Sequence, residues 1–307
     1  MPFSPQHFNG VRSGTAMAGG AMCCVQLGLA ASVGLADRLG PEGVSWLRLA
    51  WAAVILVAFT RPWRHRFTRS GLVTCALLGL TTAGMTLMFM AAAMRIPLGT
   101  ASALEFLGPL SVAVIRGRRS GRWWALAAAA GVAALTEPWH GGTDPAGILL
   151  ALGAAACWAA YILLTQRAGN AVSGLQALAV SMPVAAVATT VFVGPAVVAH
   201  LDWQLLLVGA GLALLMPVIP FSLELLALRR LKASAFGTLM SLEPAIAVVI
   251  GFVVLGQAPG LSAVLGIALV VAAGIGVTLQ GAREHEEGTP QQHDGGPLAA
   301  EAPAARS

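Results

Sequence analysis

Four ionisable side chains lie well inside long apolar stretches of this 307-residue chain. They are Arg48, Glu105, Glu224 and Glu243. A charge within the hydrocarbon core of a membrane is costly, so such residues are rare there and mark substrate sites, proton relays or ion pairs. The sequence therefore predicts that Arg48, Glu105 and Glu243 form the functional site, whereas Glu224 lies near a helix end, where it could reach interfacial water.

Glu105 lies four residues before Pro109, and Glu243 directly precedes Pro244. Proline lacks an N–H, so it leaves the carbonyl four residues earlier without its helical partner. Such carbonyls can line a cavity, and the two prolines are also candidate kinks for gating. Arg48 and Glu105 lie at similar depths in their helices, so we expect them to pair. The alternative is that these charges only hold helices together.

Further candidates lie on two other apolar stretches. Trp158 and Tyr161 are three residues apart and share a helical face, so they could wall a substrate cavity or simply pack. Pro217, Pro220 and Glu224 also share one face. The prolines predict a kink that could serve gating, with packing curvature as the alternative.

A weak internal repeat relates the two halves of the chain. Shifting the sequence by 135 positions lays Leu98–Ile115 over Ala233–Ile250, so that Pro109 falls on Pro244. With five spans in each copy, the second copy must enter the membrane in the opposite orientation. Inverted repeats are typical of secondary transporters, whose substrate site lies near the membrane midplane between the halves.

The composition predicts a membrane protein of many spans. Hydrophobic residues make up 57% of the chain and charged residues 10%, against about 25% charged in soluble proteins. A span needs about 20 apolar residues. On that basis ten spans are predicted: Gly14–Ala36, Gly43–Thr60, Gly71–Met94, Pro97–Ile115, Arg122–Thr136, Pro145–Thr165, Leu175–Val198, Trp203–Leu228, Ser234–Leu255 and Leu261–Leu279. The predicted fold is an all-α membrane protein of ten transmembrane helices in two inverted five-helix repeats, 14–136 and 145–280.

The basic residues predict the orientation. Fifteen of them fall on one side of the predicted spans and two on the other. Because basic loops remain in the cytoplasm, both termini are expected there. Residues 1–13 then form a cytoplasmic segment. Residues 281–307, rich in Gly, Pro, Glu and Gln, are predicted to be a disordered cytoplasmic tail.

Several classes of function find no support in the residues. No G-x-x-x-x-G-K-[ST] loop is present, so no ATP-driven motor is expected. The six histidines lie in loops or tails, and the four cysteines lack metal-ligand spacing, so neither a cofactor nor a metal is expected. No nucleophile–base pair can be assembled inside the bundle, so an enzyme is not expected.

The basic residues follow the topology and do not indicate a nucleic-acid partner. Ala268, Ala272 and Gly276 suit close helix contact within or between subunits, which leaves a homodimer open.

Three stretches resemble a known family. They are ALEFLGPLSVAV (103–114), ALGAAACWAAYILLTQRAG (151–169) and PFSLELLALRRLKASAFGTLMSLEPAIAVVIGFVVLGQ (220–257). They are similar to the EamA-repeat carriers of the drug/metabolite transporter superfamily, and most similar to those that export threonine and homoserine. Arg48, Glu105 and Glu243 match the residue types of the family pattern. Gln257 departs from it, since the family commonly has LGE where this chain has LGQ.

The resemblance implies a ten-helix, inverted-repeat exporter in the bacterial cytoplasmic (inner) membrane, coupled to the proton gradient. The expected function is therefore export of small amino acids of the threonine and homoserine type. Arg48 and Glu105 are expected to bind the carboxylate and ammonium of the amino acid, and Glu243 to carry the proton. A drug or other metabolite carrier of the same superfamily is the nearest alternative. A channel or a structural membrane subunit is the alternative of another class.

Overall fold

The computed structural model describes residues 5–64, 67–116, 122–136, 144–168, 175–193, 201–228, 230–231 and 233–288. Within these ranges the regular structure is helical and contains no strand, as the sequence predicts. Six helical stretches are long and apolar enough to cross a membrane: Arg12–Thr60, Arg69–Ala93, Leu98–Ile115, Pro145–Thr165, Ala235–Leu255 and Leu261–Gln280. Shorter apolar helices are Trp123–Thr136, Gln176–Thr190 and Trp203–Met216.

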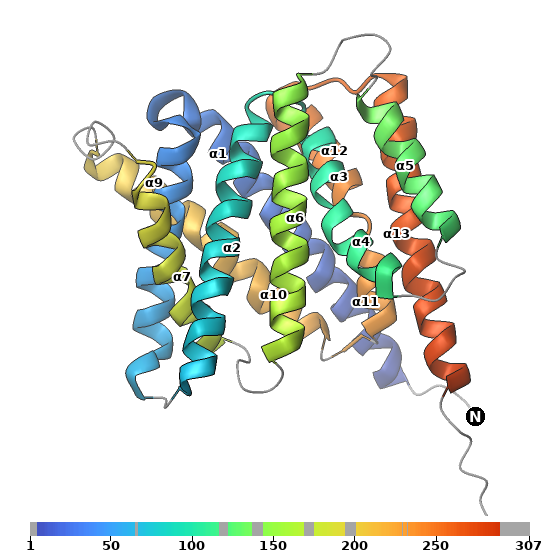
Figure 1. The fold of residues 1–307 in the computed structure, drawn as a ribbon, viewed down its shortest axis with the longest axis horizontal. Coiled ribbons are helices and arrows are strands. Elements are labelled where there is room, and N and C mark those ends of the chain that lie inside the picture. The colour runs from blue at the N-terminus through green and yellow to red at the C-terminus, as the bar shows by residue number, and fades with distance from the viewer. Residues whose placement is uncertain are drawn as a thin grey trace, which may run out of the picture.

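The helices form one bundle. In chain order they are α1 (Pro5–Thr60), the 3₁₀ helix η1 (Pro62–Arg64), α2 (Arg69–Ala93), α3 (Leu98–Glu105), α4 (Leu107–Arg116), α5 (Arg122–Thr136), α6 (Pro145–Ala168), α7 (Leu175–Thr190), α9 (Trp203–Ala213), the π-helix η4 (Leu214–Val218), α10 (Ile219–Leu228), α11 (Ala233–Met240), α12 (Glu243–Leu255) and α13 (Leu261–Gly288). Figure 1 shows α7 and α9 on one side and α5 and α13 on the other, with α3, α4 and α6 between them.

The first two predicted spans are joined within the single element α1. Two helices meet at Gly40, whose backbone (φ 71°, ψ 162°) is not helical, and Pro41 follows directly. Glycine adopts a positive φ without strain, and proline suits the first turn of the next helix. One residue is therefore enough to turn the chain back (Figure 1).

Helical structure also extends beyond the predicted outer spans. α1 begins at Pro5, inside the predicted N-terminal segment, and α13 continues to Gly288, inside the predicted tail. The remainder of that tail, 289–307, lies outside the described residues. Gly276 of the small-residue series on α13 packs directly against the Trp124 ring of α5, so this part of the series serves a contact within the chain.

Two helices break at the prolines that lie beside the acidic residues. α3 ends at Glu105 and α4 begins at Leu107, while α11 ends at Met240 and α12 begins at Glu243. Pro109 and Pro244 lack an N–H, so the carbonyls of Glu105 and Met240 lose their helical partners. Adding 135 to the bounds of α3 gives the bounds of α11, so the helices before the two breaks coincide after the 135-residue shift of the predicted repeat.

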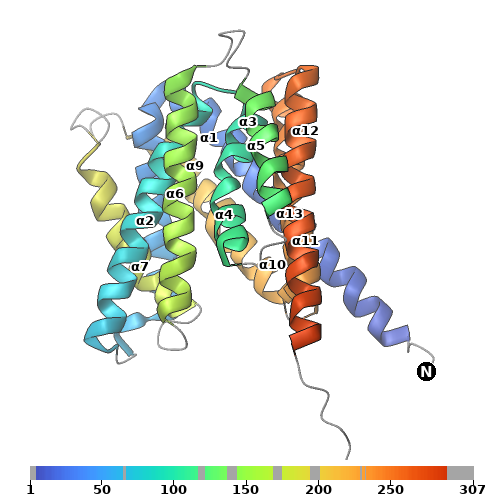
Figure 2. The same cartoon turned by 45° about the vertical axis from the view of Figure 1, so that its right-hand side comes forward.

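α3 and α12 run antiparallel against each other. The first backbone N–H of α3, at Leu98, donates to Gln257 Oε1 just beyond the end of α12, at 2.8 Å. Farther along α3, Gln26 of α1 links Ser102 to Glu243 at the start of α12. The two breaks therefore lie close to α1, in the interior of the bundle (Figure 2).

Candidate functional site

A polar cluster occupies the point where α1, α3 and α12 meet. The Nε2 of Gln26 donates to Glu243 Oε1 at 3.3 Å and lies 3.5 Å from Ser102 Oγ. Gln26 is fully buried and Ser102 nearly so. Glu105, the last residue of α3, lies within electrostatic range of Glu243. Residues far apart in the chain thus bring two carboxylates and one amide together in an apolar bundle.

Arg48 lies on the edge of this cluster, from the second half of α1. It is 6% exposed, and its Nη1 donates to Met216 Sδ at 3.4 Å. Glu105 is within electrostatic range of Arg48. A direct ion pair is not formed, however: among the described residues, the ion pair within 4 Å joins Arg95 and Asp144. Sulfur is a weak acceptor, so most of the donors of the Arg48 guanidinium remain available for an anionic ligand.

Met216 reaches Arg48 because its helix is distorted. Pro217 lies in the π-helix η4 and Pro220 at the start of α10, and Met216 itself has a non-helical backbone (φ −150°, ψ 108°). Each proline removes one helical hydrogen bond, which explains the distortion at the predicted position. Single-turn π-helices are frequent at functional sites. A gating role for these prolines stays a prediction.

The remaining candidates extend the cluster towards α6. Glu224 of α10 is half-buried and lies within electrostatic range of both Glu243 and Tyr161, so it is closer to the cluster than the sequence suggested. Tyr161 is half-buried and packs against the core group that contains Cys75 and Leu78. Trp158, also half-buried, lies one turn earlier on α6.

Sequence reasoning missed Gln26, Ser102 and Met216. A signal for Gln26 was present, because it is the only Asn, Gln or charged residue in the first predicted span, Gly14–Ala36. Ser102 and Met216 carry no comparable signal, since serine and methionine are ordinary residues of membrane helices. Their roles follow from the helix breaks and from the packing of α1 against α3 and η4.

Gln257 has a structural role outside the cluster. Gly256 adopts the left-handed conformation (φ 67°) that ends α12, and Gln257 then turns back so that its backbone N–H bonds to Gly251. Its side-chain oxygen accepts from the Leu98 N–H at the start of α3, where Pro97 provides no side-chain cap. The first N–H groups of a helix have no partner within it, so Gln257 satisfies one of them. A small cavity of about 70 Å³ lies beside this contact.

Replacing Gln257 by leucine is expected to destabilise the protein by about 1 kcal/mol, because the buried Leu98 N–H loses its acceptor. Gln257→Glu is the matched control. A carboxylate also accepts this hydrogen bond and interacts favourably with a helix N-terminus, so the stability should be retained. Thermal unfolding of the purified variants measures both effects. Equal losses in the two variants would contradict a capping role.

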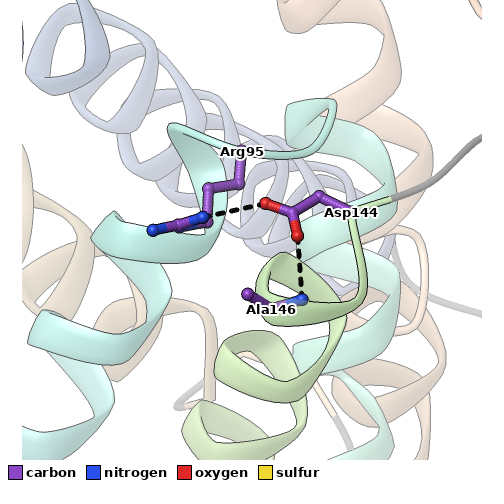
Figure 3. Close-up of polar contacts among 3 residues, drawn as sticks. All are labelled: Arg95, Asp144 and Ala146. Carbon is purple, nitrogen blue, oxygen red and sulfur yellow. Dashed lines mark hydrogen bonds and ion pairs between the residues drawn. The ribbon is translucent and has the colours of Figure 1, made fainter.

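Arg95 and Asp144 form an ion pair in the short connections before α3 and α6 (Figure 3). Arg95 Nη1 lies 3.0 Å from Asp144 Oδ2, and Asp144 Oδ1 accepts from the Ala146 N–H at 2.9 Å. The hydrogen bond from Arg95, together with that from Ala146, holds the pKa of Asp144 below its ordinary value of 3.8. Both side chains are partly exposed, so the stabilisation is small.

The stabilisation from Asp144 is expected to depend on pH. A depressed pKa stabilises the fold above the ordinary value of 3.8, and this contribution is lost as the pH falls through the lower folded value. Asp144→Asn should therefore lower the thermal midpoint slightly at about pH 7, and the difference from the wild type should disappear towards about pH 2. Melting curves across this range test it. A difference that grows in acid would contradict the assignment.

Comparisons with known proteins agree with the fold and the motifs. Residues 145–279 match the EamA-like transporter family. The chain is 40% identical over 273 residues to the threonine/homoserine exporter RhtA of Salmonella typhimurium LT2, covering 86% of this chain and 90% of that protein. It is 38% identical over 271 residues to RhtA of Escherichia coli K12, covering 84% and 89%.

A crystal structure of a protein of 19% identity has the same fold, with a TM-score of 0.56 over 88% of this chain and 99% of that one. The relatives are named as exporters and not as enzymes, which is consistent with the expectation from the sequence. The identity to these exporters extends over more than four fifths of the chain. The chain therefore belongs to the EamA-like transporters of the drug/metabolite transporter superfamily.

Proposed function

We propose that this protein is a secondary transporter that exports small amino acids of the threonine and homoserine type across the bacterial cytoplasmic membrane. The observation that carries the proposal is the polar cluster at the two helix breaks, in which Gln26, Ser102 and Arg48 are buried and Glu105 and Glu243 are half-buried. It offers one guanidinium and two carboxylates to a ligand, and an amino acid carries the complementary carboxylate and ammonium. Relatives named threonine/homoserine exporters are 38% and 40% identical to this protein over most of its length.

In this mechanism, Arg48 binds the substrate carboxylate and Glu105 binds the ammonium. Arg48 is suited to its role because the only hydrogen bond that it makes to the described residues is to a sulfur atom. Glu243 carries the proton, since it lies within electrostatic range of Glu105 and accepts a hydrogen bond from Gln26. Proton binding to Glu243 and substrate binding to Glu105 then influence each other through their charges. Trp158 and Tyr161 would wall the substrate cavity from the side of α6.

The transport cycle is a rocking of two inverted five-helix repeats, 14–136 and 145–280, around this cluster. Three observations support the architecture. The bounds of α3 and α11 coincide after a shift of 135 residues, and α3 runs antiparallel to α12. The start of α1 and the end of α13 lie at the same end of the bundle (Figure 1). That end is the proposed cytoplasmic side.

Radiolabelled threonine and homoserine efflux, compared between cells with and without the protein, tests the function. Counterflow in proteoliposomes then separates a carrier from a channel, because only a carrier saturates and exchanges labelled for unlabelled substrate. Efflux of a drug or another metabolite with no amino-acid efflux would favour another substrate of the superfamily. A folded protein with no flux at all would favour a structural subunit.

A further inference from the structure

One polar atom of the cluster has no partner. Among the described residues, the buried side-chain atoms without a hydrogen bond are Gln26 Oε1, Ser45 Oγ and Gln176 Oε1. Gln26 differs from the other two, because its amide nitrogen bonds to Glu243 in the proposed site. Buried acceptors are almost always paired, so an exception inside a binding site needs an explanation.

Glu243 determines which end of the amide is unpaired. While Glu243 is ionised, its carboxylate only accepts hydrogen bonds, so this form selects the orientation in which the amide NH₂ faces it. The amide oxygen then points away from Glu243, although it lies only about 2.3 Å from the nitrogen within the same planar group. The free acceptor is therefore held beside Glu243 and Ser102, at the junction of α1, α3 and α12.

The proposed substrates have one more polar group than the site has assigned partners. Their carboxylate and ammonium are matched by Arg48 and Glu105, and their side-chain hydroxyl is a hydrogen-bond donor. We propose that Gln26 determines specificity by accepting a hydrogen bond at Oε1 from the substrate hydroxyl. This inference depends on the proposed function. Gln26 is 0% exposed in this structure, so a substrate cannot touch it in this state. The substrate hydroxyl therefore reaches Oε1 only after the two halves move relative to each other.

The consequence is discrimination by hydrogen bonding rather than by shape. Valine has the shape of threonine with a methyl group in place of the hydroxyl, and norvaline stands in the same relation to homoserine. Either analogue leaves Oε1 buried and unpaired when it binds. A site that hydrogen-bonds a hydroxyl rejects an analogue without it far more strongly than an apolar pocket rejects a methyl group.

The test compares labelled threonine and valine efflux in proteoliposomes containing the wild type or Gln26→Met. Methionine is unbranched and of similar length but offers no strong acceptor. The threonine-to-valine ratio is expected to fall by about 10-fold or more in the variant. Gln176→Met is the matched control, because it also removes a glutamine whose buried Oε1 is unpaired among the described residues, here on the half-buried Gln176 of α7. Its ratio should equal that of the wild type.

A ratio that is unchanged in Gln26→Met, with threonine still exported, overturns the role of Gln26 and leaves the proposed function intact. A wild type that exports neither threonine nor homoserine overturns both. If Gln26→Met is not recovered in the membrane, the ratio is measured with Gln26→Asn, whose amide is one methylene shorter. The threonine-to-valine ratio of Gln26→Asn should be lower than that of the wild type. A ratio equal to that of the wild type overturns the inference.

Discussion

Replacing Glu243 by glutamine is expected to abolish export driven by a pH gradient while leaving exchange of labelled for unlabelled threonine. Glutamine has the same shape and can still bond to Gln26, but it cannot bind or release a proton. Net export needs the proton to return across the membrane, whereas exchange at equilibrium does not. Proteoliposomes with an imposed pH gradient measure the first process, and counterflow measures the second.

Glu105→Gln distinguishes the two carboxylates. If Glu105 binds the substrate ammonium, glutamine can still accept a hydrogen bond from it but lacks the opposite charge, so the apparent affinity should fall by about 10-fold or more. Both export and exchange should therefore fall. Glu42→Gln is the control, because Glu42 is exposed near the turn in α1.

For Glu243, the contradicting result is gradient-driven export that persists in Glu243→Gln. It would refute a proton-carrying role.

Replacing Gly108 by alanine is expected to destabilise the bundle by about 1–3 kcal/mol. Gly108 lies just after the α3–α4 break, and a Cβ there would overlap the backbone carbonyl of Ala155 on α6. Backbone atoms cannot move aside as a flexible side chain can, so α4 would have to shift away from α6. The thermal midpoint in detergent should fall by several degrees.

Gly19→Ala is the matched control for this prediction. Gly19 also lies in a helix, but a Cβ there would meet nothing within 4 Å. Alanine is the better helix former by about 1 kcal/mol, so this variant should be as stable as the wild type or slightly more stable. Similar losses in both variants would show that the contact between α4 and α6 is not as close as the structure has it.

Much of the candidate site could be predicted because its residues break a pattern. Arg48, Glu105 and Glu243 are charges in apolar stretches, and Pro109 and Pro244 predicted where helices would break. These are local properties, since the apolar surroundings of a charge and the missing N–H of a proline both lie within one or two turns. Glu224 was predicted to lie apart from the site because it is close to a helix end. That position along the helix does not reveal that Glu224 lies within electrostatic range of Glu243.

The sequence by itself determined the helical class, the apolar stretches and the positions of both proline breaks, because each depends on neighbouring residues. Only the tertiary structure decided which side chains meet. Gln26 joins Ser102 and Glu243, which are 76 and 217 residues away in the chain. Arg48 bonds to Met216 rather than pairing directly with Glu105. Such contacts depend on how far each helix is rotated and shifted against its neighbours. That is set by packing across the whole bundle, including the close approach of α4 to α6 and the capping of α3 by Gln257.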